Sequence, residues 1–285
     1  MRIVTIAGSG THRGLDRGRD EAGATAAAAT ALKTHLAATG RSPAALADRL
    51  ATGPLPRVAA DLVPDLWSEV TALASASRVS LSDVLLLCFL DEGWALARRG
   101  PALPPPGCSV LARVLPGRPG RIDIGGLDDD AVPPQPPTTE IAQTMDLPAW
   151  ASGRAEVLRV GPDHGPTALV LAYPGTVGLC GSNEAGLAVA VNALTDAPFS
   201  PEGLGVAFIT RQLLTLTTLA EAEAFLTAVP HAAGQAYTVA ATDGLATFEA
   251  DATGVRRVTT QNSPCCGSSE GRAKWVSPSA KTSPP

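Results

Sequence analysis

Cys108 is the residue whose setting best suits covalent chemistry. It follows Gly107 and the proline-rich stretch 101–106, where a helical texture gives way to a strand-like one. Glycine has no Cβ, so the Gly107–Cys108 peptide can reach backbone conformations closed to other residues. A thiol beside that bond could attack the Gly107 carbonyl, and water could open the resulting thioester. The pattern therefore predicts self-cleavage between Gly107 and Cys108.

The product of that cleavage would carry a nucleophile and a base on one residue. A free α-amine has an unperturbed pKa of about 7.7–8.0, so a substantial fraction is neutral near physiological pH. It could take the thiol proton, as in enzymes that pair a threonine with its own N-terminal amine. Two alternatives stay open. Cys108 is an inert small apolar side chain in a strand, or it pairs with one of the scattered histidines, which are His12, His35, His164 and His231.

Composition excludes several classes of function. The 285-residue chain has a formal net charge of −5 and no dominant basic block, which argues against a nucleic-acid partner. Its longest apolar run, 84–90, is too short to cross a bilayer, and the apolar stretch 3–7 is too short for a secretory signal. No membrane partner is expected. The richness in Ala, Gly, Pro and Arg is typical of high-GC bacterial coding.

The cysteines and histidines predict no metal site. Five cysteines at irregular spacing form neither a disulfide framework nor a zinc pattern, and the histidines share no ligand spacing. Free thiols fit a reducing compartment, so a cytoplasmic protein is expected. The acidic run 128–130 lacks the pattern of a calcium loop. The glycines at 8–14 miss the dinucleotide-binding spacing by one residue, and the next elements are helical.

The periodicities predict helices, then strands, then helices, then strands. This order indicates an α+β fold with helices outside a sheet core. The proline-, glycine- and aspartate-rich segment 116–140 is expected to be a long exposed loop. The expected helices are 18–39, 42–50, 57–76, 83–99, 204–216 and 219–229. The expected strands are 108–114, 140–145, 155–160, 167–173, 187–192, 236–242, 245–250 and 255–259.

The segment 172–194, AYPGTVGLCGSNEAGLAVAVNAL, resembles the signature of the isopenicillin N acyltransferase-like family. That family contains autoproteolytic acyltransferases and hydrolases of the N-terminal-nucleophile superfamily. Further similar stretches are 17–21 at the entry to the first helix, 142–146 (AQTMD), 205–214, 248–249 and 260–264 (TQNSP). Gly107-Cys108-Ser109 stands where the family has its cleavage site. The resemblance covers most of residues 12–264.

The resemblance implies a fold, an activity and site residues. The fold would be a four-layer αββα sandwich, with a helical segment 1–107 and a catalytic segment 108–264 forming one domain. The chain would cleave itself and then hydrolyse or transfer acyl groups of amides or thioesters through an acyl-enzyme on Cys108. Asp146 would orient the freed α-amine, and Asn262 would stabilise the oxyanion. The two fragments would stay associated, and no cofactor is needed.

Plainer roles are open for several of these residues. Asp146 precedes Leu-Pro and could hold a turn. Asn262 could be exposed to solvent, and the segment 265–285 has the composition of a disordered tail. Asn183 and Asn192 are expected to order loop and strand ends. An uncleaved, non-catalytic descendant that binds a small molecule is the main alternative function.

Overall fold

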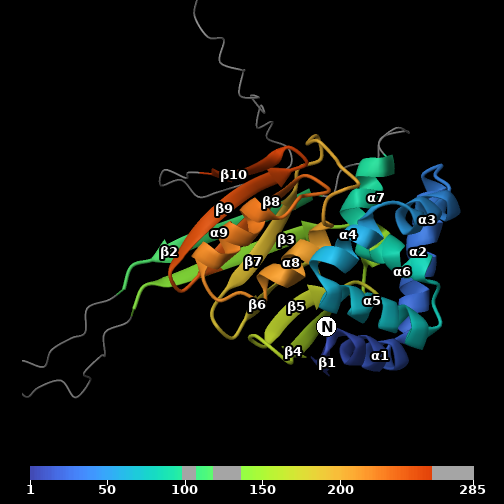
Figure 1. Ribbon diagram of the computed structural model, residues 1–285, viewed down its shortest axis with the longest axis horizontal. Helices are drawn as coiled ribbons and strands as arrows, with labels where there is room; N and C mark the ends of the chain where they lie inside the picture. Colours follow the sequence, from blue (N-terminus) through green and yellow to red (C-terminus); the bar gives the residue numbers. More distant parts are fainter. Residues whose placement is uncertain (98–106, 118–135, 259–285) are drawn as a thin grey trace, which may run out of the picture.

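The computed structural model describes residues 1–97, 107–117 and 136–258. Figure 1 shows a large twisted sheet with the N-terminal helices gathered on one side of it. The sheet has eight strands in the order β1-β4-β5-β6-β7-β8-β9-β10, and β2 and β3 form a separate two-stranded ribbon. This mixed helix-and-sheet architecture is compatible with the expected α+β class.

The large sheet is antiparallel except at one edge. There β1 (Arg2–Gly8) runs parallel to β4 (Glu156–Pro162). A strand that precedes Cys108 in the sequence thus forms the edge of a sheet whose other strands all follow Cys108. The other strands are β5 (Ala168–Ala172), β6 (Cys180–Asn183), β7 (Ala188–Ala193), β8 (Gln235–Ala241), β9 (Gly244–Asp251) and β10 (Gly254–Val258). The expected strands of this region are confirmed within a few residues. The prediction missed β6, because its four residues have no apolar alternation.

The ribbon of β2 (Gly107–Leu115) and β3 (Thr138–Asp146) packs against the large sheet. The Gln143 side chain joins the two layers: its Nε2 donates to the Val191 carbonyl at 2.6 Å, and its Oε1 accepts the Val191 N–H at 3.2 Å. The Thr139 hydroxyl donates to the Ala241 carbonyl at 3.0 Å. In Figure 1 the ribbon lies behind the sheet, and helices α8 (Val206–Leu213) and α9 (Leu219–Ala228) lie in front of it.

The N-terminal helices are shorter and more numerous than expected. They are α1 (Gly10–Asp20), α2 (Ala22–Ala38), α3 (Pro43–Thr52), α4 (Leu55–Leu62), α5 (Pro64–Ser77), α6 (Leu81–Cys88) and α7 (Leu90–Ala97). The single helix predicted over 57–76 is wrong, because Pro64 disfavours helical angles at Val63. The single helix predicted over 83–99 is also broken, at Phe89. The backbone of Phe89 leaves helical geometry. Its side chain is fully buried and packs on Phe208, with 5.3 Å between the two ring centroids.

Helix α1 starts earlier than the expected residue 18, and its glycines explain why. Gly10, Gly14 and Gly18 lie four residues apart on the face that packs against α5. A Cβ on Gly14 would stand 2.2 Å from the Glu69 carbonyl oxygen, so only glycine allows this approach. These glycines therefore serve the close packing of α1 on α5.

The other helix starts follow the capping rules. Ser42 caps α3, and Thr218 forms a capping box with Glu221 at the start of α9. Ser80 caps α6, where its side chain accepts the Asp83 N–H. A short 3₁₀ turn, η1 (Ala149–Ala151), follows the ribbon and buries Trp150.

Candidate active site

Cys108 lies at the start of the ribbon and faces the interior. It stands opposite Met145, and the next inward residue of its strand, Val110, is 4 % exposed. The Asn192 side chain donates from Nδ2 to the Cys108 carbonyl at 2.7 Å. Gly107 is an ordinary extended residue opposite Asp146, so the chain does not use glycine's special backbone angles there. Cys108 is thus held by both the ribbon and the large sheet.

Cys108 lines a small cavity of about 40 Å³. The walls come from helix α7, the ribbon, the loop before β6, strands β7 and β8, and helix α8. Most of the lining is apolar: Leu90, Trp94, Met145, Leu147, Gly178, Leu179, Val191, Ala193, Val206 and Ala207. The remaining lining residues beside Cys108 are Asp91 and Gln235. The Oε1 of the buried Gln235 has no hydrogen-bond partner among the described residues.

Asp146 lies next to Cys108 in the ladder but not in its cavity. It pairs with Gly107, and side chains of successive strand residues alternate between faces. Cys108 and Met145 therefore share the inner face, while the Asp146 side chain is exposed on the outer face. Its backbone N–H, by contrast, hydrogen-bonds to the thiol. The side chains of Asp146 and Cys108 therefore leave the ribbon from opposite faces.

The surroundings hold the Cys108 thiol in its neutral form. Burial raises its pKa to about 11, and the charges of Asp91 and Asp146 add to the rise, against hydrogen bonds from the Asp146 N–H and the Gln143 side chain. The nearby Cys180 thiol also has a pKa of about 11 through burial. A thiol in this state is a weak nucleophile until a base takes its proton.

Glu92 is a buried acid and Asp91 a half-buried one, and the sequence pointed to neither. Burial raises the pKa of Asp91 to about 6. Burial and the charge of Asp91 raise the pKa of Glu92 to about 8. Glu92 Oε1 accepts the Val206 N–H at 2.9 Å at the start of α8, while Oε2 has no partner among the described residues. The available signal was an Asp-Glu pair inside an otherwise apolar run between Phe89 and Trp94.

These pKa shifts predict that the free energy of unfolding depends on pH, and that Glu92→Gln makes this dependence weaker. The folded state binds the Glu92 proton more tightly than the unfolded state, whose pKa is near 4.5. The stabilisation that protonated Glu92 gives the folded state is full below pH 4.5 and is lost as pH rises through about 8. We expect Glu92→Gln to gain about 1–3 kcal/mol over wild type between pH 5 and pH 9. Urea unfolding at both pH values measures this, and equal pH slopes for the two proteins would contradict it.

Two buried arginines clamp the loop that forms one wall of the cavity. Arg17 of α1 donates to the Thr176 carbonyl at 2.5 Å and the Tyr173 carbonyl at 2.9 Å. Arg211 of α8 donates to the Val177 carbonyl at 2.5 Å. Gly178 follows directly with φ 150°, and a Cβ there would stand 2.5 Å from a methyl of Val170. The segment 173–178 is therefore fixed from two helices.

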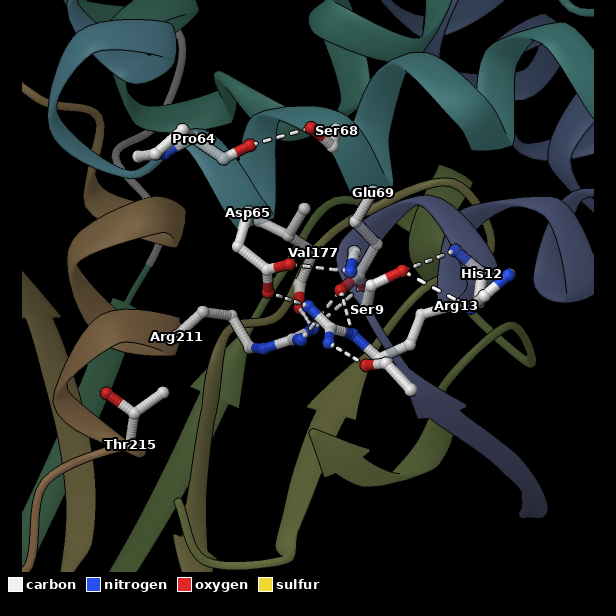
Figure 2. A network of polar contacts seen from close by, with 12 residues as sticks. Ser9, His12, Arg13, Pro64, Asp65, Ser68, Glu69, Val177, Arg211 and Thr215 are labelled. Carbon is white, nitrogen blue, oxygen red and sulfur yellow. Dashed lines mark hydrogen bonds and ion pairs between the residues drawn. The ribbon is translucent and has the colours of Figure 1, made fainter. Parts of the chain in front are cut away.

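Both clamping arginines are neutralised by buried carboxylates. Arg17 pairs with Glu21 and Glu156, each at 2.7 Å. Figure 2 shows Arg13 and Arg211 converging on Glu69, at 2.7 and 3.1 Å. Burial raises the pKa of Glu69, but the charges of Arg211 and Arg13 outweigh it and hold the pKa below its usual value. The network joins the N-terminal helices to the strands that follow Cys108.

The remaining predicted residues divide into three groups. Asn192 orders the ribbon through the Cys108 carbonyl, and Asn183 orders the β6–β7 turn by accepting the N–H groups of Ala185 and Leu187, as expected. No histidine lines the cavity within the described ranges. Asn262, the acidic run 128–130 and the tail 265–285 lie outside the described residues.

The described residues offer neither a metal-binding cluster nor a membrane-spanning helix. No cluster of three or more His, Cys, Asp or Glu residues suited to a metal ion occurs in residues 1–97, 107–117 and 136–258. Over the same ranges, every helix is too short or too polar to span a membrane.

Comparison with known proteins bears on the second half of the chain. Residues 153–266 match the family model described as acyl-coenzyme A:6-aminopenicillanic acid acyl-transferase. No curated protein matches the chain. The matched segment contains the clamped loop, strands β4 to β10 and helices α8 and α9. The resemblance to the isopenicillin N acyltransferase-like family is thereby confirmed over residues 153–266.

Proposed function

We propose that this chain is an autoproteolytic cysteine N-terminal-nucleophile enzyme that hydrolyses or transfers acyl groups. The observation that carries the proposal is the place of Cys108. It lies one residue into a strand, on the face of a cavity whose other walls include Gly178, Leu179 and Val191 of the family-matched segment. Cleavage before Cys108 would put a thiol and a free amine at the edge of that cavity.

The proposed turnover uses groups of the chain alone. The neutral α-amine of Cys108 takes the thiol proton, and the sulfur attacks an acyl carbonyl to give a thioester. Water then releases the acid, or an amine accepts the acyl group. The place of Asp146 opposite Gly107 supports its assignment to the α-amine. The role of Asn262 as oxyanion donor rests on the family resemblance.

After the proposed cleavage, segment 1–107 and the catalytic segment 108–264 of the second fragment would remain one domain. In support, β1 pairs with β4 in register over its whole length, and Arg17 forms a buried ion pair with Glu156. The ribbon would be the start of the second sheet in a four-layer αββα sandwich. Cys88, Cys108 and Cys180 are free thiols, which favours a reducing, cytoplasmic setting.

The family description supports a small-molecule acyl-amide or acyl-thioester substrate. It names an acyl-coenzyme A donor and an amine acceptor. A panel of acyl-amides and acyl-thioesters, with and without added amines, tests this. Mass spectrometry should find the acyl group on the fragment that begins at Cys108, and loss of that adduct in the presence of an amine. A cleaved protein that no donor acylates would contradict the proposed chemistry.

Asn192→Ala tests whether the Cys108 backbone must be held in place. The variant loses the 2.7 Å hydrogen bond to the Cys108 carbonyl. Because small misplacements of a reacting group are costly, we expect self-cleavage to slow by about 10–100-fold. Asn183→Ala is the comparison, since it loses hydrogen bonds to the β6–β7 turn and to the Leu214 and Leu216 carbonyls but none to Cys108. We expect it to lower the melting temperature more than the cleavage rate. Cleavage of Asn192→Ala at the wild-type rate would remove Asn192 from the site.

A further inference from the structure

The proposed self-cleavage needs a base before the α-amine exists. In the uncleaved chain the nitrogen of Cys108 belongs to an amide bond and cannot accept a proton. With a thiol pKa of about 11, only about one molecule in 10⁴ holds a thiolate at pH 7. Another group must therefore take the thiol proton in the precursor.

We propose that Asp91 is the proton acceptor for the Cys108 thiol during self-cleavage. The inference rests on the proposed function and adds a residue from the N-terminal segment to the site. Asp91 lies on α7 and lines the same cavity as Cys108. Asp146, the neighbouring carboxylate on the ribbon, is on the opposite strand face. The cavity of about 40 Å³ also admits water, which needs roughly 10–15 Å³ per molecule, so the proton can pass through one.

The charges around Asp91 leave its carboxylate available. The titratable groups that face it are Glu92 on its own helix, Cys108 on β2 and Tyr237 on β8. No ion pair joins Asp91 to any residue of the described chain. With pKa values of about 6 and about 8, Asp91 is mostly ionised at pH 7 while Glu92 is mostly neutral. The cavity is therefore lined by one carboxylate charge, on Asp91, that no cation of the described residues neutralises.

The proposed step balances without any added reagent. The thiol proton moves to the Asp91 carboxylate, and Cys108 Sγ forms a bond to the Gly107 carbonyl carbon. The C–N bond between Gly107 and Cys108 breaks, and the leaving nitrogen takes the proton from Asp91. Water then adds to the thioester carbonyl, the C–S bond breaks, and the sulfur recovers a proton. Gly107 ends as a carboxylate, Cys108 has a free amine and thiol, and Asp91 is unchanged.

Cleavage kinetics of freshly made full-length chain test this role. The sequence has two methionines, Met1 and Met145, one on each side of the cleavage site, so labelled methionine follows the precursor and the 108–285 fragment. We expect the wild-type rate to rise with pH through about 6, as Asp91 ionises, and then to level off. Asp91→Asn should cleave at least about 100-fold more slowly at pH 7, without that inflection. Asp91→Glu should recover part of the rate.

Matched variants separate a proton-transfer role from a structural one. Glu140→Gln removes an exposed carboxylate of the same ribbon strand that has no part in the site, and we expect its precursor to keep the inflection and cleave within about 10-fold of wild type. Formate, a small carboxylate, should speed cleavage of Asp91→Ala but not of Glu140→Ala. Asp91→Asn cleavage at the wild-type rate and pH profile, or Asp91→Ala cleavage that formate leaves unchanged, would overturn the inference alone. A wild-type chain that stays uncleaved at every pH would overturn the proposed function itself.

Discussion

The Cys108→Ala variant is expected to remain a single chain of 28.9 kDa while wild type yields two fragments on a denaturing gel. The substitution removes the sulfur that would attack the Gly107 carbonyl and leaves the strand in place. Cys108 already lies in a regular ladder with Met145 opposite, so alanine should fit there without disturbing the ribbon. The expected loss of self-cleavage and of acyl transfer is complete, and intact mass measures both.

A second thiol provides the control for that experiment. Cys180 lies on β6, is partly buried like Cys108 and has a similarly raised pKa of about 11. It does not line the cavity. Cys180→Ala should therefore cleave and turn over like wild type. Cleavage of Cys108→Ala at the same bond would show that another group supplies the nucleophile.

Arg17→Met is expected to cost about 3–5 kcal/mol of folding free energy. The Arg17 side chain is fully buried between Glu21 and Glu156, so the variant leaves Glu156 without its cation and Glu21 with only the 3.5 Å pair to Arg2. It also frees the Tyr173 and Thr176 carbonyls of the clamped loop. Urea unfolding measures the loss. Self-cleavage should fall as well, because the loop forms a wall of the cavity.

The matched control is Arg19→Met on the same helix. Arg19 is 64 % exposed and pairs at 3.4 Å with Asp16, which is also on the surface. Such exposed pairs contribute about 0–1 kcal/mol, so this variant should unfold nearly as wild type does. Equal losses for the two variants would mean that the buried network is not what joins helix α1 to the sheet.

The sequence predicted those strands whose position is set by nearby residues, such as turn residues at their ends. The strand predicted over 108–114 is confirmed by β2, which spans Gly107–Leu115. Strands β8 to β10 follow turn residues at regular spacing, and the structure confirms them. Breaks at Val63 and Phe89 were missed, although Pro64 marked the first of them.

The parts of the site that were missed depend on contacts between distant segments. In the sequence, Asp91 does not differ from other acids in helices. Its role depends on the packing of α7 beside the ribbon, which brings it to the same cavity as Cys108, 17 residues further along the chain. The Arg17–Glu156 pair joins positions 139 residues apart, which no local pattern can reveal. The outward side chain of Asp146 became clear only from the ladder register, because a shift of one residue reverses which face a strand residue occupies.

The N-terminal sequence of purified wild-type protein tests the central claim most directly. If the chain cleaves itself, two sequences appear in equal amounts: one from the start of the chain, and one that begins Cys-Ser-Val-Leu at position 108. A single sequence from the start of the chain, on protein that remains one intact mass after days at neutral pH, would contradict it. That result would favour an uncleaved small-molecule binding protein built on the same fold.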